Sequence, residues 1–174
     1  MFKTLLLGLT LAALAATSAS AAETLTGRGR VLNGDTLVVQ GRVIGLYGIA
    51  APGAKQSCLN AKGHGYECGA ASARALAAHV KDAALTCQVR ETDAFGRAVS
   101  VCHKDREDLS AWMVEEGHAV ADRREPAYVA NETPAWGKRR GLWAGSFEDP
   151  TNRKRQNYAR PNAVADAQAK DGTP

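Results

Sequence analysis

Apolar and polar residues alternate along the stretch Val31–Gly53, and this pattern organises the predicted fold. A period of two residues indicates strands that bury one face. Short turn sequences interrupt the alternation at residues 33–36 and at Gln40-Gly41. We therefore expect three strands that follow one another closely, at residues 24–32, 36–39 and 42–49.

The next part of the chain predicts a loop, a helix and a hairpin. Residues 51–67 are rich in glycine and lysine and show no period, which is typical of a loop. Residues 69–81 are rich in alanine and have apolar residues at helical spacing. Residues 85–103 form two apolar runs on either side of the turn Asp93-Ala94-Phe95-Gly96, which predicts a hairpin.

Two further helices are expected after the hairpin. The first, at residues 108–116, begins at Asp108, which is a favoured N-cap residue. The second, at residues 127–140, contains Pro134, which opposes helix continuation. We expect a break there, with Thr133 as the cap of a new turn and Pro134 at its first position. The side chains expected to close the core are Leu142, Trp143 and Phe147.

Five short strands with about three helices, in a chain of 174 residues, favour a mainly β fold built on a five-stranded barrel of the OB type. Residues 1–21 carry a positive charge, an apolar run and a final Ala19-Ser20-Ala21, which predict a cleaved secretory signal. A membrane anchor is the alternative, but the apolar run is too short to span a bilayer. We expect one domain at residues 22–148, followed by a basic and largely disordered tail at residues 149–174.

Four cysteines lie in the exported part of the chain, where two disulfides are the default. Counting outward from the turn of the predicted hairpin places Cys87 opposite Cys102, and cross-strand neighbours lie within disulfide reach. Cys58 and Cys68 are then left to close the intervening loop. A zinc site formed by Cys58, His64 and Cys68 is the alternative, although it lacks the closely spaced cysteine pairs of a usual zinc site.

The formal net charge of +4 is mild, so it permits contact with nucleic acid or another acidic surface without requiring it. The cations gather in the C-terminal part of the chain, at Arg123-Arg124, Lys138-Arg139-Arg140 and Arg153-Lys154-Arg155. A solvated face is sufficient to explain each of these clusters taken alone.

Several motifs occur in an order that resembles the staphylococcal nuclease-like, or thermonuclease, family. They are NGDT at residue 33, LYGIAAPG at residue 46, QSC and YECG before the alanine-rich helix, TDAFGRAVSVC at residue 92, AWMVEEGHAV at residue 111 and RRGLWAG at residue 139. The resemblance runs from about Gly27 to Phe147, and it is strongest to the exported bacterial branch with added cysteines. It implies a five-stranded OB barrel with three helices and calcium-dependent hydrolysis of DNA and RNA phosphodiesters.

The resemblance assigns chemical roles to two residues that are intact. Asp35 matches a family calcium ligand, and Arg97 matches one of the two arginines that clamp the phosphate. The reaction needs hard oxygen ligands for calcium and a carboxylate to activate water. It also needs guanidinium groups that offset the charge of the transition state.

Three other chemical side chains of the family are missing. The third strand of the family usually reads I-R-L-Y-G-I-D-A-P-E. Here Gly45 stands in place of an arginine, Ala50 in place of a second calcium aspartate and Gly53 in place of the glutamate base. Replacement groups exist nearby in the chain, although nothing in their spacing argues for such a role; they are Asn33, Lys55, His64 and Glu67.

A further difference follows the second predicted helix. The substrate-binding tyrosines of the family are expected near Asp122 and Glu125, and carboxylates at these positions repel a polyanion. With the base and one arginine also missing, ordinary calcium-dependent nuclease activity is expected to be absent. A single carboxylate at Asp35 predicts that Ca²⁺ binds weakly or not at all.

Three functions remain open from the sequence. The favoured one is an exported monomer that has lost catalysis and keeps a binding or structural role, with weak binding of nucleic acid. The second is an active nuclease with a rebuilt site, and the third is a module that binds a protein partner and never meets nucleic acid. After signal cleavage we expect no membrane contact and a location in the periplasm or outside the cell.

Overall fold

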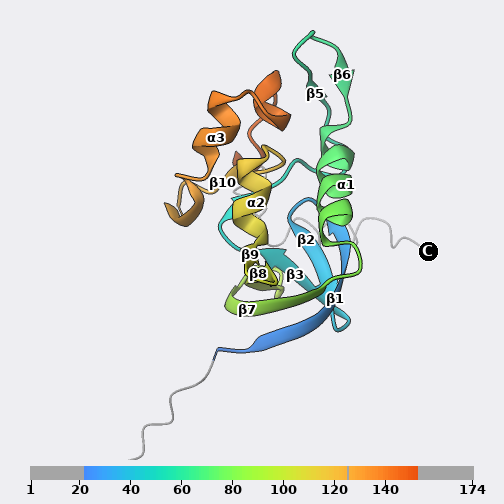
Figure 1. Ribbon diagram of the computed structural model, residues 1–174, viewed down its shortest axis with the longest axis vertical. Coiled ribbons are helices and arrows are strands. Elements are labelled where there is room, and N and C mark those ends of the chain that lie inside the picture. Colours follow the sequence, from blue (N-terminus) through green and yellow to red (C-terminus); the bar gives the residue numbers. More distant parts are fainter. Residues whose placement is uncertain (1–21, 125, 153–174) are drawn as a thin grey trace, which may run out of the picture.

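The computed structural model describes residues 22–124 and 126–152. The predicted signal segment and most of the predicted tail lie outside these described residues. Five strands form the main body of the molecule (Figure 1). They are β1 (Thr24–Asn33), β2 (Thr36–Val39), β3 (Arg42–Leu46), β7 (Ala84–Thr92) and β8 (Ala98–Lys104).

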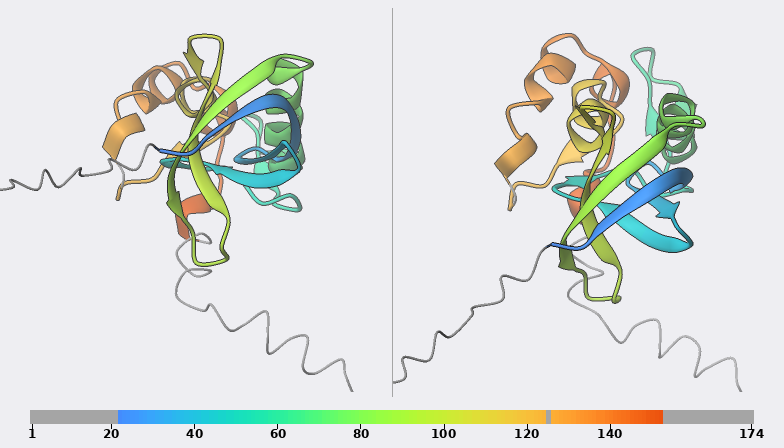
Figure 2. Two further views of the ribbon diagram at one scale, coloured as in Figure 1. Left: turned by 90° about the horizontal axis from the view of Figure 1, so that it is seen from below. Right: turned by 60° about the horizontal axis from the view of Figure 1, so that its bottom comes forward.

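These five strands close into a barrel. Antiparallel pairing runs in the order β3-β2-β1-β7-β8, and a parallel pairing of β3 with β8 closes the ring. The strands twist and cross the barrel obliquely, as the two views of Figure 2 show. The predicted mainly β fold with a five-stranded barrel is therefore confirmed.

The third strand is shorter than predicted. We expected it to run to residue 49, but β3 ends at Leu46 and the chain turns at Tyr47-Gly48. Gly48 has a φ of 71°, a left-handed conformation that favours glycine and interrupts an extended strand. The chain then forms β4 (Ile49–Ala50), which leaves the barrel and pairs with β10 (Val120–Ala121).

Three α-helices lie at one end of the barrel, and α2 lies between the other two (Figures 1 and 2). They are α1 (Cys68–Val80), α2 (Leu109–Glu115) and α3 (Glu132–Gly137). Short elements connect them: β5 (Cys58–Leu59), β6 (Gly65–Tyr66), β9 (Glu107–Asp108), and the 3₁₀ turns η1 (Pro126–Tyr128) and η2 (Gly141–Ala144). The segment predicted as a plain loop therefore contains a small hairpin, because β5 and β6 pair with each other.

Asp108 caps α2 as predicted. Its Oδ1 accepts hydrogen bonds from the backbone N–H groups of Ser110 at 2.8 Å and Ala111 at 3.2 Å, which have no partner within the helix. Its Oδ2 accepts a hydrogen bond of 2.8 Å from the Tyr128 hydroxyl. Burial, together with this bond to Asp108, raises the pKa of Tyr128 and keeps the phenol protonated.

The start of the third helix differs from the prediction by two residues. The expected break is present, since η1 is separate from α3, but the cap is Asn131 and not Thr133. Pro134 therefore lies at the third helical position, where its missing N–H removes no helical hydrogen bond. A contact distant in sequence fixes this start: Oε1 of Glu132 accepts a 2.7 Å hydrogen bond from the backbone N–H of Ala121.

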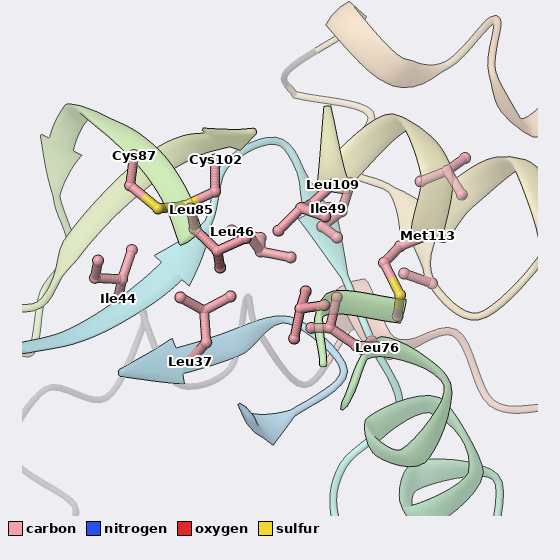
Figure 3. Close-up of a cluster of buried hydrophobic side chains, with 14 of the residues drawn as sticks. Leu37, Ile44, Leu46, Ile49, Leu76, Leu85, Cys87, Cys102, Leu109 and Met113 are labelled. Atoms are coloured by element: carbon pink, nitrogen blue, oxygen red, sulfur yellow. A yellow bond between two sulfur atoms is a disulfide. The ribbon is translucent and has the colours of Figure 1, made fainter. Parts of the chain in front are cut away.

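The main core lies inside the barrel and under the helices (Figure 3). Leu37, Ile44 and Leu46 from the barrel meet Leu76 of α1 and Met113 of α2, and all five are at most 1% exposed. The residues predicted to close the core belong to a second, smaller cluster that packs against Cys58 and Cys68; they are Leu142, Trp143 and Phe147.

Two disulfides are present, with the predicted pairing. Cys87 and Cys102 lie opposite each other on β7 and β8, and both are fully buried in the main core. Cys58 is bonded to Cys68, which ties the β5–β6 hairpin to the start of α1. The alternative zinc site is excluded, because both of its sulfur ligands are used in this disulfide.

Replacing Cys87 and Cys102 together by alanine is expected to lower the free energy of unfolding. The disulfide joins residues separated by 15 positions, and a loop of that length contributes about 3 kcal/mol through the unfolded chain. Urea denaturation measures the change. The comparison variant removes Cys58 and Cys68, which are separated by 10 positions and lie outside the main core. Because the two loops are of similar length, we expect a similar loss of stability in this variant. A loss below about 0.5 kcal/mol in the first variant would contradict the prediction.

Candidate functional site

A cavity of about 500 Å³ opens beside the turn that begins β2. Its wall combines residues of β2, β3, β4 and β8 with the turn between β7 and β8 and the loop after β4. The residues that line it are Asn33, Asp35, Thr36, Gly45, Leu46, Ala50, Pro52, Gly53, Ala54, Lys55, Asp93, Arg97, Val99 and Pro150. The structure thus brings together both intact predicted site residues and all three positions where family side chains are missing.

Asp35 is held rigidly at the edge of this cavity. Its Oδ1 accepts a 2.9 Å hydrogen bond from the Thr36 hydroxyl, and its Oδ2 accepts one of 2.9 Å from the backbone N–H of Ala51. Its backbone carbonyl accepts a hydrogen bond of 2.8 Å from the N–H of Leu46. Asp35 therefore ties the turn before β2 to β3 and to the loop after β4.

Arg97 is positioned by Asp93, a residue that sequence reasoning missed. Nε and Nη2 of Arg97 both lie 2.7 Å from Asp93 Oδ2. Asp93 Oδ1 accepts the backbone N–H groups of Phe95 and Arg97 at 2.9 Å, which shapes the turn. The side chain of Asp93 is 1% exposed and that of Arg97 is 39% exposed. The guanidinium group is therefore anchored along one edge by a buried carboxylate and still reaches solvent.

The three small residues that are expected to replace family side chains form an uncharged stretch of wall. Gly45, Ala50 and Gly53 all line the cavity, and none of them offers a side-chain donor or a charge. Gly45 has room for a larger residue, because an added Cβ would meet only Cγ2 of Val99 at 3.7 Å. The first atom of a side chain would therefore fit at this position without a clash.

Four residues were considered above as replacements for the absent family side chains, and two of them line the cavity. Asn33 and Lys55 line the cavity, so Lys55 adds a second cation to its lining. His64 and Glu67 are exposed and are not among the lining residues. Sequence spacing offered no signal for this division, because the loop after β4 folds back on the barrel through contacts with distant residues.

The described end of the chain also reaches the cavity. The side-chain amide of Gln56 donates a 2.8 Å hydrogen bond to the carbonyl of Glu148, and its oxygen accepts one of 3.1 Å from the N–H of Gly53. Gln56 therefore holds residue 148 against the loop, and Pro150 becomes part of the wall. Pro150 lies beyond the domain boundary predicted at residue 148, and no sequence signal indicated its role.

Asp122, one of the two acids predicted to repel a nucleic-acid substrate, is paired with an arginine. The side chain of Asp122 is 5% exposed, and its Oδ2 lies 2.7 Å from Nη2 of Arg124. Arg123 and Arg140 are paired in the same way with Glu132 and Glu116. Glu125, the second predicted acid, lies outside the described residues. The predicted repulsion from Asp122 is therefore offset by a neighbouring guanidinium group.

A second cavity of about 380 Å³ lies between α1, the β5–β6 hairpin and η2. His118 and Tyr66 line it together with the disulfide-bonded Cys68, and neither Asp35 nor Arg97 reaches it. Burial lowers the pKa of His118, while the nearby charge of Glu116 opposes this change. Burial also raises the pKa of Tyr66. Both side chains therefore favour their neutral forms.

Residues 22–124 and 126–152 form neither a metal-binding cluster nor a membrane-spanning helix. No group of three or more His, Cys, Asp or Glu side chains in these ranges is arranged to hold a metal ion. None of the helices formed by these residues is long and apolar enough to cross a bilayer.

Residues 43–145 match the family described as "Staphylococcal nuclease homologue". The chain belongs to this family. A curated relative, the succinoglycan biosynthesis protein ExoI of Rhizobium meliloti (strain 1021), is 36% identical over 148 residues. The alignment covers 82% of this chain and 77% of ExoI.

In this staphylococcal nuclease homologue, the family match and the cavity overlap closely. The matched range includes Gly45, Ala50, Gly53 and Arg97, whereas Asp35 lies before it. The predicted family is therefore confirmed, and the cavity lies mostly within the part of the chain that defines it.

One close backbone contact positions the loop that lines the cavity, and it predicts the effect of Gly69→Ala. An added Cβ at Gly69 would lie 1.7 Å from the carbonyl oxygen of Gly53, so the loop or the start of α1 must move. Overpacking of this kind costs about 1–3 kcal/mol, although alanine is the better helix former. We expect a lower melting temperature, measured by circular dichroism.

The matched control for this variant is Gly65→Ala. An added Cβ at Gly65 meets no atom within 4 Å, so the melting temperature should change little. Equal stability of the Gly69 variant and wild type would show that the Gly53 carbonyl does not constrain this loop.

Proposed function

We propose that this staphylococcal nuclease homologue has lost phosphodiester hydrolysis and retains weak binding of nucleic acid in the cavity beside Asp35 and Arg97. The observation that carries this proposal is the uncharged wall formed by Gly45, Ala50 and Gly53 around these two residues. The cavity keeps the shape of a binding site and one anchored guanidinium group, but it lacks the groups that would drive chemistry.

Hydrolysis needs a general base, and the lining residues offer none that is well placed. Gly53 has no side chain where the family has glutamate. The carboxylate of Asp93 is engaged by Arg97, and that of Asp35 by Thr36 and Ala51. A general base contributes about 10²- to 10⁴-fold and a phosphate-clamping arginine about 10³- to 10⁵-fold, although these effects are not additive. Loss of both supports the absence of measurable turnover.

The donor set also does not fit calcium, on which the family normally depends. Ca²⁺ takes six to eight oxygen ligands, commonly from several carboxylates. Asp35 supplies one carboxylate at the cavity, Asp93 supplies another that is already bound to Arg97, and Ala50 supplies a methyl group where the family has an aspartate. Tight Ca²⁺ binding is therefore not part of the proposed function.

The cavity offers two cationic side chains that can bind a phosphate, Arg97 and Lys55. The edge of Arg97 that carries Nε and Nη2 is fixed by Asp93, and with 39% of the side chain exposed the rest of the group can contact a ligand. A guanidinium group held in one orientation loses little entropy when it binds an anion. Lys55 adds a second cation to the same cavity. Two cations without stacking tyrosines support weak rather than tight binding.

The proposed function includes export of the protein from the cytoplasm. The two disulfides favour an oxidising compartment such as the periplasm or the cell exterior.

The second candidate function comes from ExoI, whose name assigns it to succinoglycan biosynthesis. A part in such biosynthesis, through a saccharide or protein partner and without nucleic acid, is the main competitor of our proposal.

A turnover assay tests the loss of catalysis. Purified protein is incubated with single-stranded and double-stranded DNA and with RNA, in Ca²⁺, Mg²⁺, Mn²⁺ or chelator. We expect cleavage at background level in every condition, because the base and one arginine are missing. Metal-dependent cleavage that disappears in Asp35→Ala would overturn this proposal.

The matched variant for this assay restores the family side chains through Gly45→Arg, Ala50→Asp and Gly53→Glu. A gain of metal-dependent cleavage would show that these three positions limit the chemistry. No gain at all would mean that other positions also disable the site.

A salt titration tests nucleic-acid binding. Fluorescence anisotropy with single-stranded DNA should give an affinity that falls as salt rises, because bound cations release counterions from the phosphates. Arg97→Gln should weaken binding and reduce the slope by about 0.7, the value for one phosphate contact on a single strand. The control, Arg106→Gln, removes an exposed cation that does not line the cavity. An affinity that is independent of salt would favour the competing function.

A further inference from the structure

Trp136 has the most exposed large apolar side chain in the described part of the chain. It is 67% exposed, whereas Trp112 and Trp143 are half-buried. It lies on α3, which packs beside α2 at the periphery of the molecule, on the side away from α1 (Figures 1 and 2). A single exposed apolar side chain is common on protein surfaces, so the surroundings of this indole decide what it can bind.

The surface around this indole is open. The inner side of α3 is filled by Glu132 and Ala135, which are buried, so Trp136 projects from the outer side. The next residue, Gly137, has no side chain, and an added Cβ there would meet no atom within 4 Å. Pro134 is also exposed and carries no charge. A flat ring can therefore approach the indole without a steric barrier from these neighbours.

Positive charge gathers at the same end of α3. Lys138 and Arg139 follow directly and are both exposed. The acid on this helix, Glu132, is buried and paired with Arg123, so it does not cancel these two cations. Two exposed cations thus follow Trp136 closely in the chain, and Nη2 of Arg139 also donates a 3.4 Å hydrogen bond to the carbonyl of Ala144.

Arg139 occupies a backbone position that favours glycine. Its φ is 51°, in the left-handed region, where the chain leaves α3. Glycine is the usual residue at such a helix end, because a Cβ is strained there. The chain therefore carries a cation beside Trp136 at a position where glycine would be more stable.

We propose that Trp136, Lys138 and Arg139 form a contact for single-stranded nucleic acid outside the cavity, with a base stacked on the indole and phosphates near the two cations. This inference rests on the proposed function, because it extends the retained binding to a second surface. Stacking platforms flanked by cations bind single strands with little sequence preference.

A protein partner fits this surface less well. Stable protein interfaces bury about 800 Å² on each side around a mainly apolar centre. Trp136 is an isolated apolar group, since the other exposed large apolar residues lie on different elements; they are Leu32, Val43, Leu59 and Phe95. One ring beside two cations matches a polymer that alternates rings and phosphates.

The test compares two labelled oligonucleotides of equal length and charge, one of thymidylate and one with abasic sites. Trp136→Ala in the full chain should weaken binding of the thymidylate strand by about 5-fold or more, and binding of the abasic strand by much less. The control, Leu59→Ala, removes a side chain that is 45% exposed on β5, and it should bind both strands like wild type.

Arg139→Gly separates binding from stability. It should raise the melting temperature, because glycine suits a φ of 51°, and it should reduce the salt slope of binding by about 0.7. Reduced binding by a more stable protein cannot result from misfolding.

Several outcomes would overturn the inference. Trp136→Ala could bind thymidylate as well as Leu59→Ala does, or it could lose affinity equally for the abasic strand. Concentration-dependent self-association that Trp136→Ala abolishes, with unchanged oligonucleotide binding, would show that a second copy covers the indole. If Arg97→Gln weakens binding and Trp136→Ala does not, this inference fails alone; if wild type binds neither strand, the proposed function fails with it.

Discussion

The parallel pairing of β3 with β8 is the constraint on which the fold and the site both depend. It closes the barrel by joining strands that are far apart in the sequence, and it sets Gly45 opposite Val99. Because β8 begins directly after the turn that holds Arg97, the same pairing brings this arginine to the cavity that Asp35 borders.

The contacts that hold the site in place do not depend on the three small residues that line it. The contacts that position the site use backbone groups and retained polar side chains: Asp35 binds the loop after β4, and Asp93 shapes the β7–β8 turn. None of them needs a side chain at Gly45, Ala50 or Gly53. Small residues at these three positions therefore remove charge from the cavity without removing a hydrogen bond from the scaffold.

Most of the barrel could be predicted from the sequence, because its strands alternate apolar and polar residues between recognisable turns. The end of β3 was missed, since the turn at Tyr47-Gly48 lies inside an apolar run and only Gly48 marks it. The start of α3 was missed for another reason. Asn131 and Thr133 are both acceptable caps, and the choice is made by the hydrogen bond from Ala121 to Glu132, a contact that local sequence does not report.

In the candidate site too, residues positioned by local contacts could be predicted from the sequence, whereas those positioned by distant contacts could not. Asp35 and Arg97 could be found because each lies in a short turn motif. Asp93 could have been found too, since an aspartate four residues before Arg97 is the natural partner of that turn. Lys55 and Pro150 could not, because Gln56 and Glu148, which bring them to the wall, are separated by 92 positions in the sequence.

The pairing of charges decides which surfaces can attract an anion. Clusters of arginine in the sequence suggested a basic C-terminal part, yet Arg123, Arg124 and Arg140 are each bound to a neighbouring carboxylate. Such pairs contribute little field at a distance, because each guanidinium group is offset within a few ångströms. Arg97 is also paired with a buried carboxylate, and it differs from Arg123, Arg124 and Arg140 in that it lines the cavity beside Asp35. The position of each arginine relative to the cavity, rather than the number of arginines, therefore determines how much positive charge lines it.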